Sequence, residues 1–215
     1  MNELNYTLLS DGSSDKAFEF VLTWLLRNCG VECAINFEWV DLRQLPQPPK
    51  KLPDKIKTSL DLYPCDLLFI HRDAEKEPRQ KRITEIKEAI EEARKLVEVP
   101  PAVCVVPVRM QEAWLLFDES AIRKAAGKPR GKQPLQLPAM DRLEQKPDPK
   151  QLLHELLRQA SERKGRALKK LRVDPLVYQV ASFIGDFSPL RALSAFSALE
   201  EDIQRVVREE GWGVE

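Results

Sequence analysis

The chain has 215 residues, 43% of them hydrophobic and 32% charged, and its 34 lysines and arginines balance its 34 aspartates and glutamates. This length suits one domain with an appendage and argues against two large independent domains. No apolar run approaches the roughly eighteen residues of a membrane span, and no secretion-type leader opens the sequence. We therefore expect a soluble, cytoplasmic protein, whose zero net charge leaves nucleic-acid binding to a local basic patch.

Strand and helix patterns alternate from the first residues onward. Residues 6–10 form a short β-prone run that stops at Asp11, and apolar side chains then recur at helical spacing over 17–26. A second strand is expected over 33–40. Four prolines within 45–53 remove backbone donors, so they predict a surface loop there.

The most continuous buried-strand pattern, DLLFIH, covers residues 66–71, and a charged amphipathic helix is expected over 79–97. Another apolar, β-branched strand over 102–108 leads into a helix near Arg109. Such alternation is typical of βαβ units, whose right-handed connections build a mostly parallel sheet with helices on both faces. The sequence therefore predicts an α/β, Rossmann-like fold.

The character of the sequence changes after Lys124. Residues 126–149 are rich in Gly, Pro, Lys and Gln, which favours a flexible connection. Two helices are expected beyond it, over 149–171 and 190–207. We therefore predict an α/β domain over 1–125 and a helical C-terminal region over 150–215.

Acidic residues follow three of the expected strands. Asp11 and Asp15 follow the first, Asp73 and Glu75 follow DLLFIH, and Glu112 follows the strand at 102–108. Function in an open parallel sheet tends to sit beyond these strand ends. Clustered carboxylates repel one another unless a cation lies among them, and Mg²⁺, or Mn²⁺ in its place, suits oxygen ligands. The pattern predicts a metal site.

Other interpretations of single residues stay open. Asp15 also suits the first turn of a helix, where the exposed amides favour negative charge. Arg72 and Arg109 can grip phosphate oxygens or only pair with the neighbouring acids. His71 can assist proton transfer or be structural, and Trp114 is expected in the core. The four cysteines are expected to be buried free thiols, because they lie mostly in apolar stretches and the spacing of a zinc or redox site is absent.

Three segments resemble a known family: LLSDGSSDKAF, FIHRDAE and VPVRMQEAWLL. They look like the Toprim fold, in particular the small DUF4276 proteins related to the OLD-family nucleases, over roughly the first half of the chain. The resemblance implies a Mg²⁺-dependent nuclease in mobile-element or phage defence. Its metal-binding and catalytic residues would be Asp11, Asp73, Glu75 and Glu112.

Two of these positions depart from the family pattern. The first acid is usually Glu where this chain has Asp11, and the second acid of the pair is usually Asp where it has Glu75. Both changes keep the charge but alter the reach of the side chain. They are compatible with a retuned metal site and also with lost activity.

A basic stretch over 158–172 includes Lys164 and Arg166, which are candidates for contacts to a nucleic-acid backbone. A solvated helix face explains the same pattern. No Walker-type motif is present, so an ATPase would have to be a separate polypeptide partner.

Two functions from different classes follow. The first is a metal-dependent nuclease or other phosphodiester-cleaving enzyme. The alternative is a catalytically weak interaction module that uses the same scaffold to bind a protein or nucleic acid. A nucleotide-binding α/β protein is a weaker third option, because the loop after the first strand has too little glycine to cradle a phosphate.

Overall fold

A parallel sheet forms the centre of the molecule. The computed structural model describes residues 2–12 and 14–213, and within them the sheet has four strands in the order β2-β1-β3-β4. The strands are β1 (Glu3–Leu9), β2 (Ala34–Val40), β3 (Leu67–His71) and β4 (Ala102–Val105). All three pairings are parallel. The predicted α/β class is confirmed.

Both faces of the sheet are covered by helices. On one face, α1 (Phe18–Asn28) and α8 (Ser194–Glu209) share a core with strand residues such as Leu8 and Phe69. On the other, α2 (Leu52–Leu62) and α3 (Arg79–Ala93) pack on strand residues such as Leu68 and Ile70. Because β3 is central and covered on both faces, all five of its side chains are buried.

The strand order creates a switch point between β1 and β3. The chain leaves β1 toward β2 on one side, and it returns past β1 to place β3 on the other side. Loops that follow β1 and β3 therefore diverge and leave a crevice at the carboxyl ends of these strands. This geometry places the residues after Leu9 and after His71 at one edge of the sheet.

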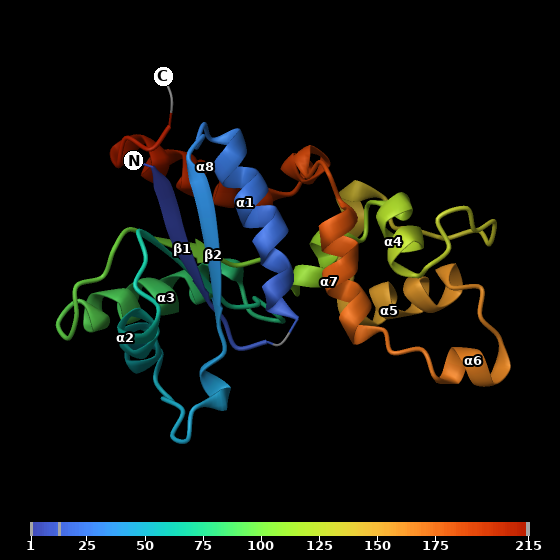
Figure 1. Ribbon diagram of the computed structural model, residues 1–215, viewed down its shortest axis with the longest axis horizontal. Coiled ribbons are helices and arrows are strands. Elements are labelled where there is room, and N and C mark those ends of the chain that lie inside the picture. The colour runs from blue at the N-terminus through green and yellow to red at the C-terminus, as the bar shows by residue number, and fades with distance from the viewer. Residues whose placement is uncertain (1, 13, 214–215) are drawn as a thin grey trace.

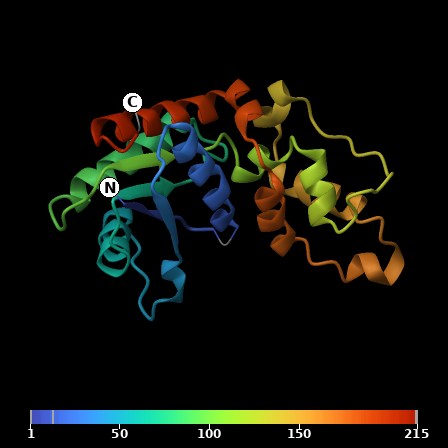
Figure 2. The same ribbon diagram turned by 45° about the horizontal axis from the view of Figure 1, so that its top comes forward.

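A helical lobe lies beside the α/β body (Figures 1 and 2). It contains α4 (Glu119–Ala125), α5 (Pro149–Ala160), α6 (Gly165–Lys169) and α7 (Asp174–Phe183), and α4 contacts both α5 and α7. Short 3₁₀ helices connect these parts: η1 (Asp15–Ala17), η2 (Leu42–Gln44), η3 (Gln111–Leu115), η4 (Met140–Gln145) and η5 (Ser188–Ala192).

Several elements differ from the sequence prediction. The strand expected over 102–108 ends at Val105, two residues before Pro107. The helix expected over 149–171 is divided into α5 and α6, because Glu162 and Gly165 both adopt positive φ angles between them. Helices α2 and α7 have no counterpart in the prediction. Each has a proline in its first turn, where proline is tolerated because that amide has no partner within the helix.

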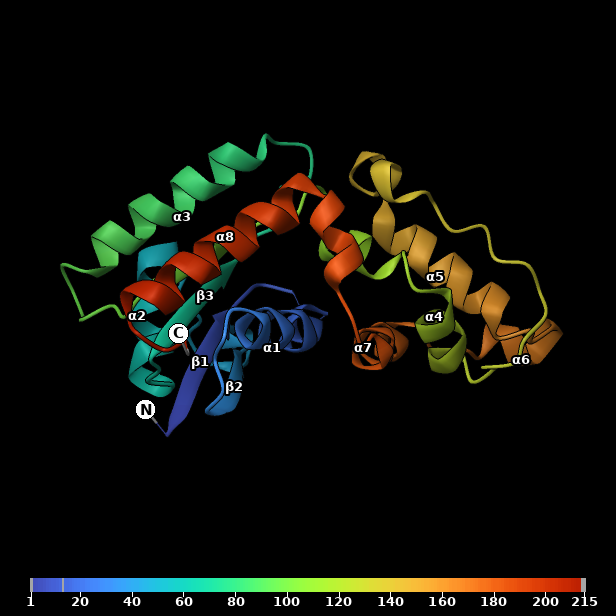
Figure 3. The same cartoon turned by 90° about the horizontal axis from the view of Figure 1, so that it is seen from above.

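The C-terminal helix does not stay with the rest of the helical region. Helix α8 returns to the α/β body and lies along the sheet next to α1 and β4, as Figure 3 shows from above. The predicted domain limits at 125 and 150 remain predictions, but helices from before and after these limits pack against one another. One hydrophobic core runs from β1 through α8 to α5 and α7.

Three further expectations can be compared with the structure. None of the helices in residues 2–12 and 14–213 has the length and apolarity that a membrane crossing requires. Cys29, Cys33, Cys65 and Cys104 are all free, as predicted, but of these four only Cys104 is buried, so the predicted burial is wrong for the other three, which are partly exposed. Trp114 is 1% exposed, which confirms its place in the core.

The docking of α8 can be tested with two phenylalanines. Phe196 on α8 is fully buried, whereas Phe183 at the end of α7 is 43% exposed. Phe196→Ala is expected to lower the free energy of unfolding by about 3–5 kcal/mol, and Phe183→Ala by no more than about 0.5 kcal/mol. Urea denaturation measures both. Equal losses would show that α8 is not part of the main core.

Candidate functional site

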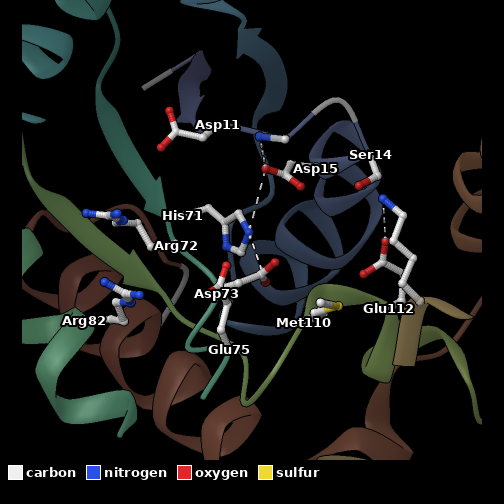
Figure 4. A pocket seen from close by; sticks show the side chains of 12 residues that line it. Asp11, Ser14, Asp15, His71, Arg72, Asp73, Glu75, Arg82, Met110 and Glu112 are labelled. Carbon is white, nitrogen blue, oxygen red and sulfur yellow. Dashed lines mark hydrogen bonds and ion pairs between the residues drawn. The ribbon is translucent and has the colours of Figure 1, made fainter. Parts of the chain in front are cut away.

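A cavity of about 250 Å³ opens at the carboxyl ends of β1 and β3 (Figure 4). Among the described residues, its acidic lining consists of Asp11, Asp15, Asp73, Glu75 and Glu112. The rest of the wall is Gly12, Ser14, His71, Arg72, Arg82, Met110 and Lys150. The cavity therefore brings together the four acids predicted as metal ligands, whose roles remain predictions, and it adds Asp15.

His71 lies between two of these carboxylates. Its Nδ1 is 2.9 Å from the carbonyl oxygen of Val105, which can only accept, so Nδ1 carries a proton. Its Nε2 is 3.4 Å from Asp73 Oδ1 and 3.8 Å from Asp15 Oδ2. The imidazole is 4% exposed. Nε2 is consequently directed at both acids.

The Asp15 side chain lines the cavity, although the residue also begins the short helix η1. One of its carboxylate oxygens accepts a hydrogen bond from the backbone N–H of Gly12 at 2.8 Å, and the other accepts from Gln111 Nε2 at 3.2 Å. The residue is 5% exposed. Its burial among site residues supports the functional interpretation over the simple helix-start one.

Gln111 connects the two central acids. Its side chain donates to Asp15, and its backbone N–H donates to Asp73 Oδ1 at 3.2 Å. The sequence patterns do not single out this residue, although it directly precedes Glu112. A glutamine at an otherwise apolar position in the segment after β4 is the signal that could have found it.

Burial and like charge act together on Asp73. Desolvation raises the pKa of this carboxyl above its usual value, and the nearby charges of Asp15 and Glu75 raise it further. His71 and the N–H of Gln111 act in the opposite direction. The ionised form of Asp73 is thus only partly compensated, and a cation would supply the remainder.

Glu112 has the most strongly shifted carboxyl of the cavity. It is 2% exposed, and its Oε1 has no hydrogen-bond partner among the residues that the structure describes. Lys150 Nζ is 4.0 Å away, which is beyond hydrogen-bond range. Desolvation by burial raises the pKa of Glu112 to about 7. A buried carboxylate oxygen without a donor is unusual, and a metal ion or its bound water would satisfy it.

The loops after β3 and β4 hold each other in strained conformations. Glu75 and Arg109 both have positive φ angles, of 53° and 68°, which non-glycine residues rarely adopt. The N–H of Glu75 donates to the Arg109 carbonyl at 2.9 Å, and the Arg109 guanidinium donates to the Glu75 carbonyl at 3.3 Å. Such strain tends to cluster at functional sites. Arg109 supports the loop and is absent from the cavity wall.

Cations surround the acids on several sides. Arg72 and Arg82 both approach Glu85, at 3.5 and 2.9 Å, and both line the cavity. Lys55 forms an ion pair with Asp11, whose side chain is 58% exposed. The sequence patterns do not indicate Lys150 or Lys55, because their helices are distant in sequence from the acids. They do not indicate Arg82 either, because it lies among the many charged residues of α3.

Lys164 and Arg166 lie elsewhere. They belong to the start of α6 at the far end of the helical lobe (Figure 1), and α6 has no buried residue. Lys164 lines a separate open hollow with Lys132 and Arg163. The structure does not bring these two predicted substrate contacts to the acidic cavity.

Comparisons with known proteins give no match: no family model, no curated protein and no solved structure is similar to this chain. The suitability of the cavity for a metal therefore rests on its own residues. In the described part of the chain, no three His, Cys, Asp or Glu side chains converge closely enough to surround one ion. Mg²⁺ commonly uses only one or two carboxylates plus water and phosphate oxygens, so the oxygen donors present fit its chemistry.

Replacing Glu112 by the uncharged Gln tests its burial. The folded-state pKa of about 7 lies above the ordinary 4.5, so the folded protein binds the extra proton and stability falls as pH rises between these values. In metal-free protein, Glu112→Gln is expected to raise the free energy of unfolding at pH 8 by on the order of 1–3 kcal/mol and to change it little at pH 4.5. Urea denaturation with EDTA at both pH values measures this. An equal effect at the two pH values would contradict it.

Proposed function

We propose that this protein is a metal-dependent phosphodiester hydrolase that acts on nucleic acid. The observation that supports this most is the buried acidic cavity at the switch point, in which Glu112 has an unpartnered carboxylate oxygen and the charge of Asp73 is only partly compensated. Arg72, Arg82 and Lys150 in the same wall supply cations for phosphate oxygens. The resemblance to the Toprim fold supports the same proposal.

Mg²⁺ or Mn²⁺ would be held by Asp73 together with Asp15 or Glu75, with Glu112 at the opposite wall. When bound, the ion neutralises the phosphodiester and lowers the pKa of a water molecule. Asp11 contributes only if its ion pair with Lys55 opens.

The side chains of the cavity have separable roles in this proposal. The guanidinium groups of Arg72 and Arg82 orient non-bridging phosphate oxygens, since their planar donors match that geometry. His71 holds a proton at Nδ1 and presents Nε2 to Asp15 and Asp73, so it can accept a proton from the attacking water or pass one to a carboxylate. Gln111 keeps both acids oriented.

The distribution of charge supports a polynucleotide as substrate. Residues 127–172 contain 13 of the 34 lysines and arginines but only 5 of the 34 aspartates and glutamates. That segment therefore carries a net charge of about +8, and the rest of the chain carries about −8. A basic lobe next to an acidic site can hold the phosphate backbone on either side of the scissile bond.

A second candidate, nucleic-acid binding without catalysis, is favoured by two observations. Asp11 is ion-paired to Lys55, and no preformed group of three ligands is present among residues 2–12 and 14–213. The two functions differ in whether the acids are needed for cleavage, so one variant of the acidic cavity distinguishes them.

Asp73→Asn keeps the shape of the side chain but removes its charge. It is expected to reduce Mg²⁺-dependent cleavage of a mixed panel of DNA and RNA by at least about 100-fold, and to weaken Mn²⁺ binding measured by calorimetry. The control is Asp61→Asn, because Asp61 is exposed on α2 and pairs with Lys57 on the same helix. Cleavage that survives Asp73→Asn would refute the catalytic role. Nucleic-acid binding without any cleavage would favour the second candidate.

The basic lobe makes a separate prediction about salt. Lys164→Gln combined with Arg166→Gln is expected to weaken nucleic-acid binding and to reduce the slope of log K against log salt by about 1.4–1.8, since each phosphate that a cation neutralises contributes roughly 0.7–0.9 to that slope. Fluorescence anisotropy at several salt concentrations measures the slope. The matched control is Lys87→Gln with Lys95→Gln, two exposed positions on and just beyond α3. The same slope change in both pairs would show that the lobe has no special part.

A further inference from the structure

A second cavity, of about 280 Å³, lies where the helical lobe meets the α/β body. Its wall comes from the segment around η1 and from α5 and α7. The lining residues are Ser14, Lys16, Lys150, His154, Asp174, Pro175, Val177 and Tyr178. The roles proposed above for the acidic cavity do not involve α7, so this second cavity still lacks a function.

The second cavity shares a wall with the acidic one. Ser14 and Lys150 line both. Lys150 is also the cation that lies 4.0 Å from the unpartnered oxygen of Glu112. A molecule with its phosphate group among the acids therefore extends naturally into the second cavity, past the Lys150 ammonium.

The chemistry of the second wall is different from that of the first. Pro175, Val177 and the ring of Tyr178 give it an apolar side. The Lys16 ammonium lies 5.7 Å from the centre of the Tyr178 ring. An aromatic ring that is only partly buried, with a cation nearby, is suited to stack against another flat ring.

His154 adds a hydrogen-bonding group to this wall. Its Nε2 is buried and has no hydrogen-bond partner within residues 2–12 and 14–213, and the carboxylate of Asp174 is 3.9 Å away. Desolvation lowers the pKa of this imidazole, the charges of Lys150 and Arg158 lower it further, and those of Asp174 and Asp148 oppose the shift. A neutral imidazole has one donor and one acceptor nitrogen, which suits the edge of a heterocyclic base.

We propose that the second cavity binds one nucleoside, with its base against Tyr178 and near His154, and with its phosphate directed toward the acidic cavity. The inference rests on the proposed function for the position of that phosphate. A base that stacks on Tyr178 inside this cavity must first leave its base pair and its stack. The substrate class is therefore a single-stranded or locally unpaired nucleic acid.

The experiment compares four probes by calorimetry in the presence of Mg²⁺: a set of nucleoside 5′-monophosphates, ribose 5-phosphate, adenosine and inorganic phosphate. The monophosphates are expected to bind about 10-fold more tightly than ribose 5-phosphate, because only they carry the stacking base. Equal affinities for the two would overturn the proposal.

Two substitutions at one position show where the base binds. Tyr178→Leu and Tyr178→Phe both remove the hydrogen bond from the Tyr178 hydroxyl to Glu19, but only Tyr178→Phe keeps the ring. The tighter binding of the monophosphates relative to ribose 5-phosphate is expected to disappear in Tyr178→Leu and to persist in Tyr178→Phe. If Tyr178→Leu unfolds, NMR on the unmodified protein provides the test instead, by measuring contacts between base protons and the Val177 methyl groups. Tighter binding of the monophosphates without these contacts would overturn the proposal.

The remaining probes separate this inference from the proposed function. Binding of inorganic phosphate that requires Mg²⁺ and is abolished in Asp73→Asn supports the acidic cavity alone. Adenosine carries no phosphate, so its binding, if abolished in Tyr178→Leu, supports the nucleoside site alone. Cleavage activity together with equal affinities for the monophosphates and ribose 5-phosphate overturns the nucleoside site and leaves the hydrolase intact. Tighter binding of the monophosphates without Mg²⁺-dependent phosphate binding overturns the hydrolase and leaves the nucleoside site intact.

Discussion

The position of the candidate site depends on the packing of Trp114. Its ring lies between Phe196 of α8 and Phe18 of α1, with ring centres 5.4 and 5.8 Å away, and Phe18 in turn contacts the His71 ring at 4.6 Å. A row of aromatic rings therefore runs from the C-terminal helix to the histidine between the two central acids. Because Trp114 is fixed, the short helix η3 that bears it is fixed as well, and so are Gln111 and Glu112.

The acids of the cavity present an energetic problem that the fold only partly solves. Asp15 receives two hydrogen bonds and Asp73 receives one from a backbone amide, whereas Glu112 receives none at its buried oxygen. Burying incompletely paired carboxylates lowers stability. Natural proteins retain such destabilising groups mainly where the charges serve a function, which is the physical basis for placing function here.

Much of this arrangement follows from sequence patterns. The apolar run LLFIH predicts a central strand because both faces of β3 are covered, and the acids after β1, β3 and β4 meet because parallel strands end at one edge. The limits of pattern reasoning are also visible. Proline in the first turn of α2 and α7 makes these two helices look like loops, and the positive φ angles at Glu162 and Gly165 divide a helix that looks continuous.

Sequence patterns do not identify those cavity residues that only tertiary packing brings into place. Lys150 comes from α5 and Arg82 from α3, and neither has a local signal that links it to Glu112 or Asp73. The same holds for the ring of Tyr178, whose neighbourhood exists only because α7 packs against η1. Periodicity describes one element at a time, so it does not reveal a wall built from several elements.

The unequal distribution of charge has a consequence beyond affinity. A protein with no net charge exerts little force on a distant ion, but this chain separates roughly eight positive charges in the segment 127–172 from as many negative charges elsewhere. It is therefore an electric dipole, and within about one Debye length a polyanion is turned before it touches the surface. For the proposed nucleic-acid substrate, encounters would begin at the helical lobe, and the acidic cavity would meet only a polynucleotide that the lobe has already oriented.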